Sequence, residues 1–346
     1  MGITALAAKA AKGKLEKFQY DPGQLGDEQV EIAVKYCGIC HSDLSMLNND
    51  WGMSAYPFVP GHEVVGTVAA VGPKAKRVKV GDTVGLGWYS HSCLTCHQCL
   101  RGDQNLCTGN AGPGGTPGAE QTIIGRHGGF ATRVRANWEW VTPLPKGIDA
   151  AKAGPLFCGG ITVFNPIVLN NIKPTDRVGV IGIGGLGHLA LQFLNAWGCE
   201  VVAFTSSDNK KDEAIKLGAH RAVNSRDDAQ IGSVKGSLNF ILNTANANMN
   251  WPAFIDALAP GGKLHTVGAV PEPIAVSPFL LLAGQKSIGG SPLGSPATTE
   301  TMIEFCGRHK INAVTETFKM SQANEALHHL ESGKARYRVV LEQDLG

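Results

Sequence analysis

Short alternating segments dominate the first 150 residues of the chain. Apolar and polar residues alternate over Gln29–Tyr36 and over Glu63–Val71, and a shorter apolar run covers Val80–Leu86. Alternation with a period of two is typical of a strand with one buried face. A segment rich in glycine and proline between residues 109 and 120 is typical of a loop. This part of the chain therefore predicts an all-β unit of barrel or sandwich type.

The pattern changes after Asn170, where predicted strands begin to alternate with predicted helices. Arg177–Ile183 predicts a strand, which leads through a glycine turn into a helix over Leu186–Trp197. This alternation indicates βαβ units and a parallel sheet. The remaining elements that the pattern predicts are strands at Glu200–Phe204, Phe240–Asn243, Lys263–Val267 (after a turn at Pro260–Gly262) and Tyr337–Glu342, and helices at Asn209–Leu217, Glu300–Lys310 and Ser321–Ser332.

Length and charge exclude several classes of protein. The 346 residues correspond to about two domains at ~150 residues each. Hydrophobic residues make up 43% and charged residues 17%, which excludes disordered and fibrous classes. The net charge of +2 gives no strong attraction to nucleic acid or to an anionic membrane. The N-terminal segment has no apolar signal-peptide core, and Val178–Leu191 is too short and too rich in glycine to span a bilayer. We therefore expect a cytoplasmic protein that binds neither nucleic acid nor a membrane.

A glycine-rich loop follows the predicted strand at Arg177. Gly182, Gly184 and Gly187 match the pattern G-x-G-x-x-G between a strand and a helix. The first glycine permits a tight turn, the second lets a pyrophosphate approach the backbone, and the third lets helix and strand pack closely. The N-terminus of the helix would then supply N–H groups to the phosphates. The loop predicts a dinucleotide site, with a purely structural turn as the alternative.

The residues after the next strand bear on the choice of cofactor. NAD sites usually place an acidic residue about 20 positions beyond the loop, where it binds the ribose hydroxyls. Here the strand ends in Thr205, Ser206 and Ser207, with Lys210 and Lys211 nearby; the alternative for both lysines is a solvated helix face. Hydroxyl groups and a cation suit a 2′-phosphate, so we expect NADP(H) to be preferred over NAD(H). Asp208 is the opposing residue, because it would bind the ribose if the strand ended slightly later.

Four cysteines lie within 15 residues of one another, at Cys93, Cys96, Cys99 and Cys107. Four thiolates with no open position are typical of a structural zinc site. The spacing matches neither ferredoxin pattern, which disfavours an iron–sulfur cluster. Free or redox-active thiols are the other alternative. We expect this zinc to stabilise a loop and to take no part in chemistry.

A second set of possible ligands is dispersed along the chain. Cys40, His62 and Cys158 would bind zinc with one position open, which is the arrangement of a catalytic site. No spacing rule links them. On composition alone, two unrelated buried cysteines and a core histidine are the favoured interpretation.

Six motifs, which occur in the same order as in a known family, favour the catalytic zinc site over unrelated buried residues. The chain resembles the zinc-dependent medium-chain alcohol dehydrogenases, and within them the NADP-dependent cinnamyl alcohol dehydrogenase branch. The resemblance covers essentially the whole chain. The motifs are CGICHSDL (37–44), PGHEVVGTV (60–68), VGDTVGLGW (80–88), the four-cysteine loop, CGGITVF (158–164) and GIGGLGH (182–188).

The resemblance implies an α/β protein in which a Rossmann domain with a doubly wound parallel sheet is inserted into a GroES-like, β-rich catalytic domain. We expect the catalytic domain at residues 1–157 and 292–346 and the Rossmann domain at 158–291. The family also implies two zinc ions per chain and a homodimer, formed through the edge of the Rossmann sheet near Leu264–Ile288.

The resemblance also implies roles for single residues. Cys40, His62 and Cys158 would ligate the catalytic zinc, and Glu63 would be an alternative ligand. Asp43 would orient His62, and Ser42 would lie nearest the substrate oxygen. The residues that would contact the cofactor are His41, Thr162, Gly182, Gly184, Gly185, Leu186, Gly187, Thr205, Ser206, Ser207, Lys210 and Val267.

The chain departs from the family at Ser45, where many relatives have a histidine that ends the proton relay. The relay beyond Ser42 is therefore open. Four tryptophans are candidates for the wall of a substrate pocket, although ordinary packing is the favoured interpretation for each one taken singly. Trp51 and Trp88, near the zinc motifs, are better candidates than Trp138 and Trp140.

The expected reaction is reversible hydride transfer between NADP(H) and a primary alcohol–aldehyde pair, aliphatic or aromatic. A polyol or secondary-alcohol dehydrogenase is the alternative within the class, and a non-catalytic, zinc-stabilised NADPH sensor is the alternative outside it.

Overall fold

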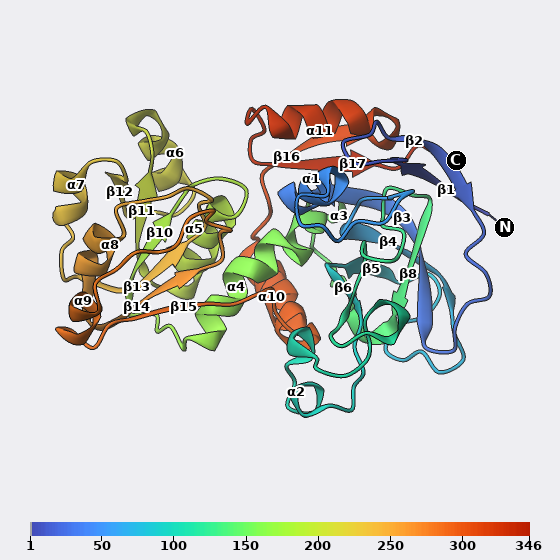
Figure 1. Ribbon diagram of the computed structural model, residues 1–346, viewed down its shortest axis with the longest axis horizontal. Coiled ribbons are helices and arrows are strands. Elements are labelled where there is room, and N and C mark those ends of the chain that lie inside the picture. Colours follow the sequence, from blue (N-terminus) through green and yellow to red (C-terminus); the bar gives the residue numbers. More distant parts are fainter. Residues whose placement is uncertain (1) are drawn as a thin grey trace. The chain divides into compact units, whose positions relative to one another are not determined.

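The computed structural model describes residues 2–346, which form two compact units (Figure 1). The first comprises the chain up to Ile161 together with Gly294–Gly346, and the second comprises Thr162–Leu293. The chain therefore leaves the first unit once and returns to it near the C-terminus. Both ends of the sequence contribute to one core.

The first unit is built around a seven-stranded, largely antiparallel sheet. Its longest strands carry buried side chains such as Val30, Ile32 and Val64, which pack into one hydrophobic core. The sheet has the order β16 (Thr315–Lys319), β17 (Arg338–Glu342), β3 (Gln29–Ile39), β4 (Glu63–Val71), β5 (Thr83–Leu86) and β9 (Val141–Pro143), with β8 (Arg133–Asn137) also paired to β3.

Shorter elements complete the first unit. Helix α11 packs against β17, so its buried residues Ala326 and Leu327 join the core of the sheet. These elements are two-stranded pairs β1 (Ile3–Ala7) with β2 (Glu16–Tyr20) and β6 (Tyr89–His91) with β7 (Glu120–Gln121), and helices α1 (His41–Asn48), α2 (His97–Leu100), α3 (Ala150–Ala153), α10 (Pro296–His309) and α11 (Ala323–Glu331).

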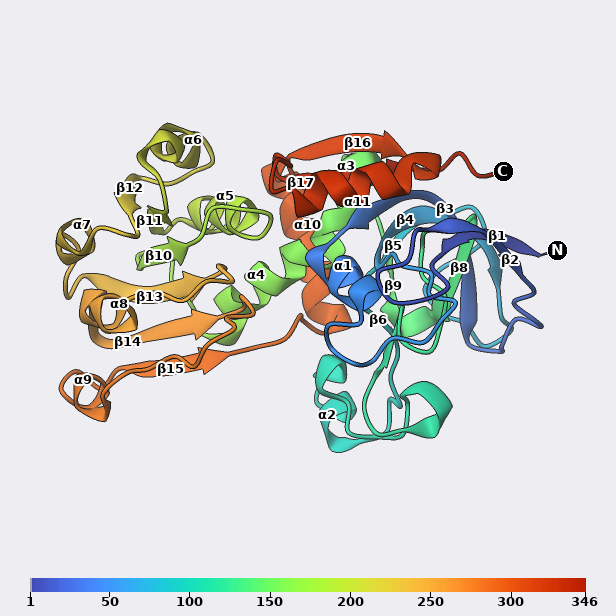
Figure 2. The same cartoon turned by 45° about the horizontal axis from the view of Figure 1, so that its top comes forward.

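The second unit contains a six-stranded parallel sheet (Figure 2). The strand order is β12 (Arg221–Asn224), β11 (Glu200–Thr205), β10 (Arg177–Ile181), β13 (Leu238–Asn243), β14 (Leu258–Thr266) and β15 (Ser287–Gly290). Its helices are α4 (Gly159–Leu169, which begins in the first unit), α5 (Gly187–Trp197), α6 (Lys211–Lys216), α7 (Asp228–Gly232), α8 (Trp251–Ala257) and α9 (Pro278–Leu282).

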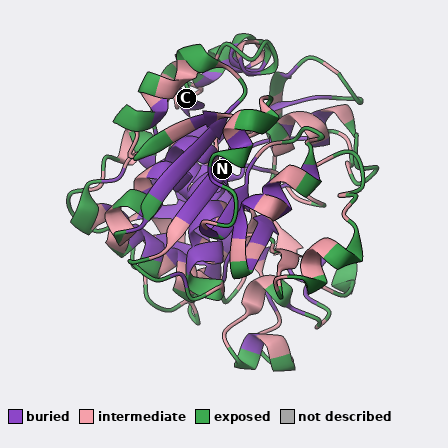
Figure 3. Cartoon of the chain, turned by 90° about the vertical axis from the view of Figure 1, so that its left-hand side faces the viewer, coloured by how far each residue is buried: buried purple, intermediate pink, exposed green. Residues whose placement is uncertain are grey.

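Packing explains why these strands are almost entirely apolar. The interior positions of β10 and β11 are buried, and Figure 3 shows exposed residues mainly on the outer faces of helices and on loops. Phe204 packs with Phe254 of α8, while α5 packs on β10 and β11 through buried residues such as Leu189. When helices cover both faces of a parallel sheet, each strand is a continuous run of apolar residues, and the sequences of β10 and β11 are such runs.

Most predicted elements are confirmed within a few residues. β4 has the predicted bounds, whereas β3 continues three residues further than predicted, to Ile39. The segment Val80–Leu86 is shorter as a strand, because Gly81 has a φ of 94° and turns the chain before β5. Helix α6 is also shorter than predicted, because the residues Asp208–Lys210 form a 3-10 turn.

The predicted turn at Pro260–Gly262 is wrong. These residues belong to β14, which runs from Leu258 to Thr266. The two glycines and the proline are accommodated by an irregular register against β13 between Leu238 and Phe240, and Gly261 has a φ of 75°. Glycine in a strand often marks such an irregularity, and its local sequence resembles that of a turn.

No single helix within residues 2–346 is long and apolar enough to cross a membrane. The bent pair Ala150–Phe157 and Gly159–Leu169 meets the requirements of length and composition only when its two parts are joined.

Candidate catalytic and cofactor sites

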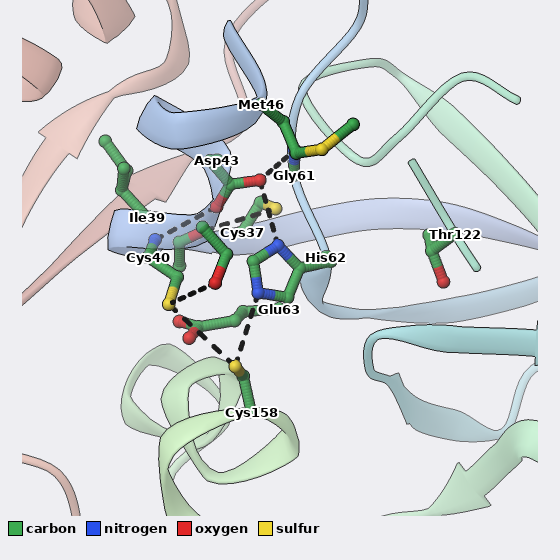
Figure 4. Close-up of polar contacts among 12 residues, drawn as sticks. Cys37, Ile39, Cys40, Asp43, Met46, Gly61, His62, Glu63, Thr122 and Cys158 are labelled. Atoms are coloured by element: carbon green, nitrogen blue, oxygen red, sulfur yellow. Dashed lines mark hydrogen bonds and ion pairs between the residues drawn. The ribbon is translucent and has the colours of Figure 1, made fainter. Parts of the chain in front are cut away.

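Three separate segments of the first unit bring together Cys40, His62, Glu63 and Cys158. One ligand atom from each of these side chains lies within 4.8 Å of the others (Figure 4). Cys40 directly precedes α1, His62 directly precedes β4, Glu63 is the first residue of β4, and Cys158 directly precedes α4. Residues far apart in sequence thus meet where a helix and a strand begin, which is why no spacing rule linked them.

The cluster has the geometry expected of metal ligands. The Nε2 atom of His62 lies 3.3 Å from the Sγ atom of Cys158, and the two sulfur atoms of Cys40 and Cys158 are 3.9 Å apart. His62 is fully buried. Two sulfur atoms and one imidazole nitrogen form a Cys2His donor set, which in zinc enzymes leaves one position for substrate.

Asp43 determines the orientation of His62. Its buried carboxylate accepts hydrogen bonds from the Nδ1 atom of His62 at 2.9 Å, from the backbone N–H of Gly61 at 2.8 Å and from that of Cys40 at 2.9 Å. Because Nδ1 donates to Asp43, Nε2 is the nitrogen that faces the sulfur atoms. A carboxylate behind a histidine ligand is a recurrent feature of zinc sites.

The electrostatics of the cluster favour bound cations. Hydrogen bonding with Cys158 lowers the pKa of Cys40 well below its ordinary value, although burial opposes this shift. Burial disfavours a charged His62, but the nearby Asp43 carboxylate raises the pKa of His62 well above its usual range. The thiolate form of Cys40 that this shift favours is the form in which cysteine binds a metal ion.

Glu63 has an unusual environment beside this cluster. It forms a buried ion pair with Arg338, and the same guanidinium donates to the carbonyl of Ile39 at 3.4 Å. The second oxygen, Oε2, has no hydrogen-bond partner within residues 2–346. Burial raises the pKa of Glu63 to about 7, although Arg338 acts in the opposite direction. A Cβ atom on Gly38 would lie 2.0 Å from Oε2, so only glycine leaves room for this carboxylate.

The donor set and the orphaned Oε2 together fit a zinc ion. Zinc binds thiolate, imidazole and carboxylate, and the residues present offer all three kinds of ligand. A buried carboxylate oxygen without a partner is costly unless a cation or a donor reaches it. Cys40, His62 and Cys158, with Glu63 beside them, are therefore the residues that would hold the metal.

Polar and aromatic side chains surround the cluster. The Oγ atom of Ser42 lies 3.8 Å from the Sγ atom of Cys40, whereas His41 is exposed. The ring of Trp88 packs edge-on against His62 at 4.9 Å, and the ring of Trp51 packs against Trp88 at 6.1 Å. The structure thus joins the two favoured tryptophans to the site.

Trp138 and Trp140 have other surroundings. Trp140 packs on Tyr89 and donates to Ser92, and Trp138 lies under Lys76.

The four-cysteine loop folds into a compact cluster of its own. The Sγ atoms of Cys93 and Cys99 are 3.9 Å apart, and those of Cys96 and Cys107 are 4.0 Å apart. Backbone hydrogen bonds from Cys99 and Thr108 lower the pKa of Cys96 to about 5. All four ligand atoms lie within 4.8 Å of one another, which fits a tetrahedral metal with no open position.

The dinucleotide loop has the backbone that its sequence requires. Gly182 has a φ of 86°, and a Cβ atom on Gly187 would lie 1.9 Å from the carbonyl oxygen of Gly182. A Cβ atom on Gly184 would meet nothing within 4 Å, so the backbone there is open to a ligand. Gly185 and Leu186 lead directly into α5.

A cavity of about 430 Å³ lies beside this loop in the second unit. Of the cofactor residues predicted in this unit, Gly182, Thr205, Ser206 and Lys210 line it. The predicted residues that do not line it are Thr162, Gly184, Gly185, Leu186, Gly187, Ser207 and Val267. Thr162 lies on α4, and Val267 follows β14, with its N–H bonded to the carbonyl of Asn243. The lining residues that the sequence pattern missed are Ile183, Ser225, Arg226, Asp228, Ala245, Ala247, Asn248, Met249 and Asn250.

Asp208, the residue that opposed an NADP site, does not line this cavity. Its Oδ1 atom forms an ion pair with the Nζ atom of Lys211 at 2.7 Å. Asp208 and Lys211 neutralise each other on the 3-10 turn and the start of α6. Lys210, unlike these two residues, lines the cavity.

Comparison with family models identifies the chain. Residues 26–146 match the alcohol dehydrogenase GroES-like domain, and residues 185–308 match the zinc-binding dehydrogenase domain. The chain belongs to the zinc-dependent medium-chain alcohol dehydrogenase family. It is an oxidoreductase of the cinnamyl alcohol dehydrogenase-like branch, and the predicted fold class is confirmed.

Known relatives span almost the entire chain. It is 58% identical to the aldehyde reductase AdhA of Synechocystis sp. over 98% of both chains. It is 38% identical to a probable mannitol dehydrogenase of Medicago sativa, over 97% of this chain and 93% of the relative.

Solved structures share the whole fold. The cinnamyl alcohol dehydrogenase SbCAD4 of Sorghum bicolor superposes with a TM-score of 0.89 at 35% identity, covering 99% of this chain and 98% of the other. The CAD of Helicobacter pylori, solved in complex with NADP(H), superposes with a TM-score of 0.87 at 27% identity, with coverage of 99% and 98%.

Proposed function

We propose that this dehydrogenase interconverts primary alcohols and aldehydes by hydride transfer with NADP(H). The observation that carries the proposal is the buried Cys40–His62–Cys158 triplet with Asp43 behind His62. A Cys2His site is what a zinc alcohol dehydrogenase uses to hold its catalytic ion with one position open to substrate. The name of the aldehyde reductase AdhA supports the same substrate class.

A zinc ion bound here would supply Lewis acidity to the substrate oxygen. Asp43 keeps Nε2 of His62 directed at the metal position and raises its basicity. Glu63, held by Arg338 with one oxygen unpaired, would be an alternative ligand for the ion. Ser42, beside Cys40, is the hydroxyl that would accept the proton of an alcohol.

The relay beyond Ser42 has to differ from that of many relatives, because position 45 is a serine. Ser45 lies one helical turn after Ser42 on α1, and His41 is exposed at the start of the same helix. We propose that His41 or solvent takes the proton from Ser42.

The cofactor proposal rests on the second unit. Thr205, Ser206 and Lys210 line the cavity beside the glycine loop, and Asp208 is paired elsewhere. Two hydroxyls and an ammonium group favour a 2′-phosphate over a ribose diol. The NADP(H) complex of the Helicobacter pylori relative supports the same choice.

The four-cysteine loop is the proposed site of a second, structural zinc. Its four sulfur atoms leave no position for substrate. Together with the Cys2His site this gives two zinc ions per chain.

The substrate pocket of the proposed enzyme is aromatic near the metal. Trp88 packs on His62 and Trp51 packs on Trp88. Two indole rings offer apolar area and suit medium-sized aliphatic or aromatic aldehydes better than a polyhydroxylated chain, which needs many hydrogen-bond partners.

The alternative within the class is a polyol or secondary-alcohol dehydrogenase, which the name of the Medicago sativa relative favours. Turnover of mannitol in preference to every aldehyde would establish it. A non-catalytic NADPH sensor is the alternative outside the class, and the intact ligand triplet argues against it.

We also propose that the two units are the predicted domains, 1–157 with 292–346 and 158–291, within a cytoplasmic homodimer. The boundaries differ by a few residues from those of the compact units. β15 is the last strand of the parallel sheet, so its free edge is the proposed dimer contact.

The experiment that tests the catalytic assignment is substitution of the ligands. Cys40→Ala and His62→Ala should each abolish aldehyde reduction and leave NADPH binding, measured by fluorescence titration, within about twofold of the original. Cys306→Ala is the matched control, because Cys306 is buried on α10 outside both clusters. Rates near those of the unmodified enzyme in either ligand variant would refute the assignment.

A further inference from the structure

Arg226 lies beside the proposed phosphate-binding residues although it is distant in the sequence. Strands β11 and β12 are parallel neighbours in which Thr205 is paired with Asn224. One residue further on, the N–H of Ser225 donates to the carbonyl oxygen of Thr205 at 2.8 Å. Arg226 follows directly, level with the residues after Thr205. It therefore enters the same cavity lining as Ser206 and Lys210.

Hydrogen bonds fix the backbone at Arg226, whereas its side chain makes none within residues 2–346. Its N–H donates to Oδ1 of Asn224 at 3.0 Å, and the N–H of Asn224 donates to Gln230 at 3.1 Å. The next residue, Asp227, caps α7 by accepting from Ala229 and Gln230. The guanidinium of Arg226 forms no ion pair or hydrogen bond within residues 2–346. An exposed arginine on a fixed backbone is thus available to a ligand.

Neighbouring cations differ from Arg226 in this respect. Lys211 is paired with Asp208 and also donates to Gln230 at 2.9 Å. Arg221, at the other end of β12, donates to the hydroxyl of Ser233. Among the described residues, Lys210 and Arg226 are the cations that line this cavity, and neither forms an ion pair with a carboxylate.

The charge of the lining depends on Arg226. The charged lining residues are Lys210, Arg226 and Asp228, and Asp228 accepts from Asn250 at 2.9 Å. With Lys210 alone, the single positive charge would be cancelled by Asp228. With Arg226 the lining is net positive, as a phosphate dianion requires.

We propose that Arg226 is a second cation for the 2′-phosphate of NADP(H) and that it contributes to cofactor specificity. The inference rests on the proposed NADP(H) function and adds a residue to it. A guanidinium presents paired N–H donors that match two oxygens of a phosphate, which a lysine cannot do. The competing role is stacking of the guanidinium on the adenine ring, which NAD(H) and NADP(H) share.

Binding of 2′,5′-ADP and of 5′-ADP, measured by titration calorimetry, separates these roles without turnover. For Arg226→Gln we expect the affinity for 2′,5′-ADP to fall about tenfold or more, in keeping with the loss of a charge-assisted bond, and that for 5′-ADP to change less than twofold. Arg226→Lys should recover part of the loss. Arg221→Gln is the control, since it removes an arginine from β12, the strand just before Arg226, that does not line the cavity, and it should change neither affinity.

The outcomes are distinct. Equal losses for both ligands in Arg226→Gln would overturn the proposal in favour of adenine stacking. Unchanged affinity for both would overturn it outright, while the proposed cofactor would stand if the unmodified protein still preferred 2′,5′-ADP. Absence of that preference in the unmodified protein would instead refute the proposed NADP(H) function itself. Circular dichroism melting of each variant confirms that it is folded.

Discussion

The carboxylate of Asp43 joins three parts of the catalytic cluster. It accepts from His62, from the backbone of Gly61 before it, and from the backbone of Cys40 at the start of α1. One buried side chain thus fixes the imidazole ring of His62 and also the backbone at two proposed ligands, His62 and Cys40. Its effect on metal binding should therefore exceed that of a single hydrogen bond.

Replacing Asp43 by alanine should weaken zinc binding at the Cys2His site about 10- to 100-fold. The physical reason is that His62 loses the acceptor that fixes its tautomer and the two backbone N–H groups lose their partner. Competition with a chromogenic chelator measures the affinity. Asp50→Ala, an exposed substitution just beyond the same helix, should leave the affinity unchanged. An equal effect of both substitutions would contradict the role of Asp43.

The sequence allowed some residues of the site to be predicted and not others. Cys40, His62 and Cys158 were found through the contexts around them and a family resemblance, because only the fold brings them within reach of one another. Arg338 was missed altogether. Nothing near it in the sequence indicates that its guanidinium enters the core to meet Glu63. Long-range ion pairs leave no local periodicity.

At the scale of elements, the four-cysteine loop is a unit with its own small core. Apart from the cysteines, its buried members are only Ala111 and Ala119. Such a small apolar cluster cannot stabilise a loop of this length, so bound metal has to supply much of the stability.

Cys96→Ala should therefore release one zinc per chain and lower the melting temperature. The zinc of the Cys40 cluster should be retained, because the two clusters share no ligand. Elemental analysis together with calorimetric melting measures both quantities. Cys199→Ala serves as the control, since Cys199 lies in the second unit outside either cluster. Retention of both metals by Cys96→Ala would rule out the structural site.

Strand β14 contains a buried histidine that makes stability depend on pH. Burial lowers the pKa of His265 to about 4, and nearby Lys263 acts in the same direction. Nδ1 faces the amide of Asn170 and Nε2 faces the hydroxyl of Ser291, while Phe240 packs beside the ring. The folded protein therefore favours neutral imidazole.

Between pH 6.5 and about 4 the unfolded chain binds a proton at His265 that the folded chain does not. This contribution to stability is complete above pH 6.5 and is lost as the pH falls towards 4. His265→Gln removes it, so the melting temperature of this variant should fall less over that range. The exposed His328→Gln should behave like the unmodified protein. Parallel curves for His265→Gln and the unmodified protein would disprove the effect.

Elements with strong local periodicity were predictable, and those fixed by distant contacts were not. β4 and α5 carry their own pattern and were placed within a residue or two. α4 was missed because it is apolar almost throughout and contains Pro166, so no helical face stands out. α1 was missed because its eight residues include three that serve the site, His41, Ser42 and Asp43.

At the scale of the whole molecule, the two proposed tasks lie in different units. The metal clusters belong to the first unit and the dinucleotide cavity to the second. Chain length predicted two domains but not that one is inserted into the other, since length does not record which segments share a core. That arrangement followed from the resemblance, which rests on six motifs in order.

The most direct test of the account is a set of initial rates for reduction of aldehydes of increasing size, measured with NADPH and NADH in parallel and with mannitol oxidation alongside. We expect kcat/KM for medium aliphatic and aromatic aldehydes to be at least tenfold higher with NADPH than with NADH, and mannitol oxidation to be slower than oxidation of the matching primary alcohols. A preference for NADH, or turnover of polyols alone, would contradict the account.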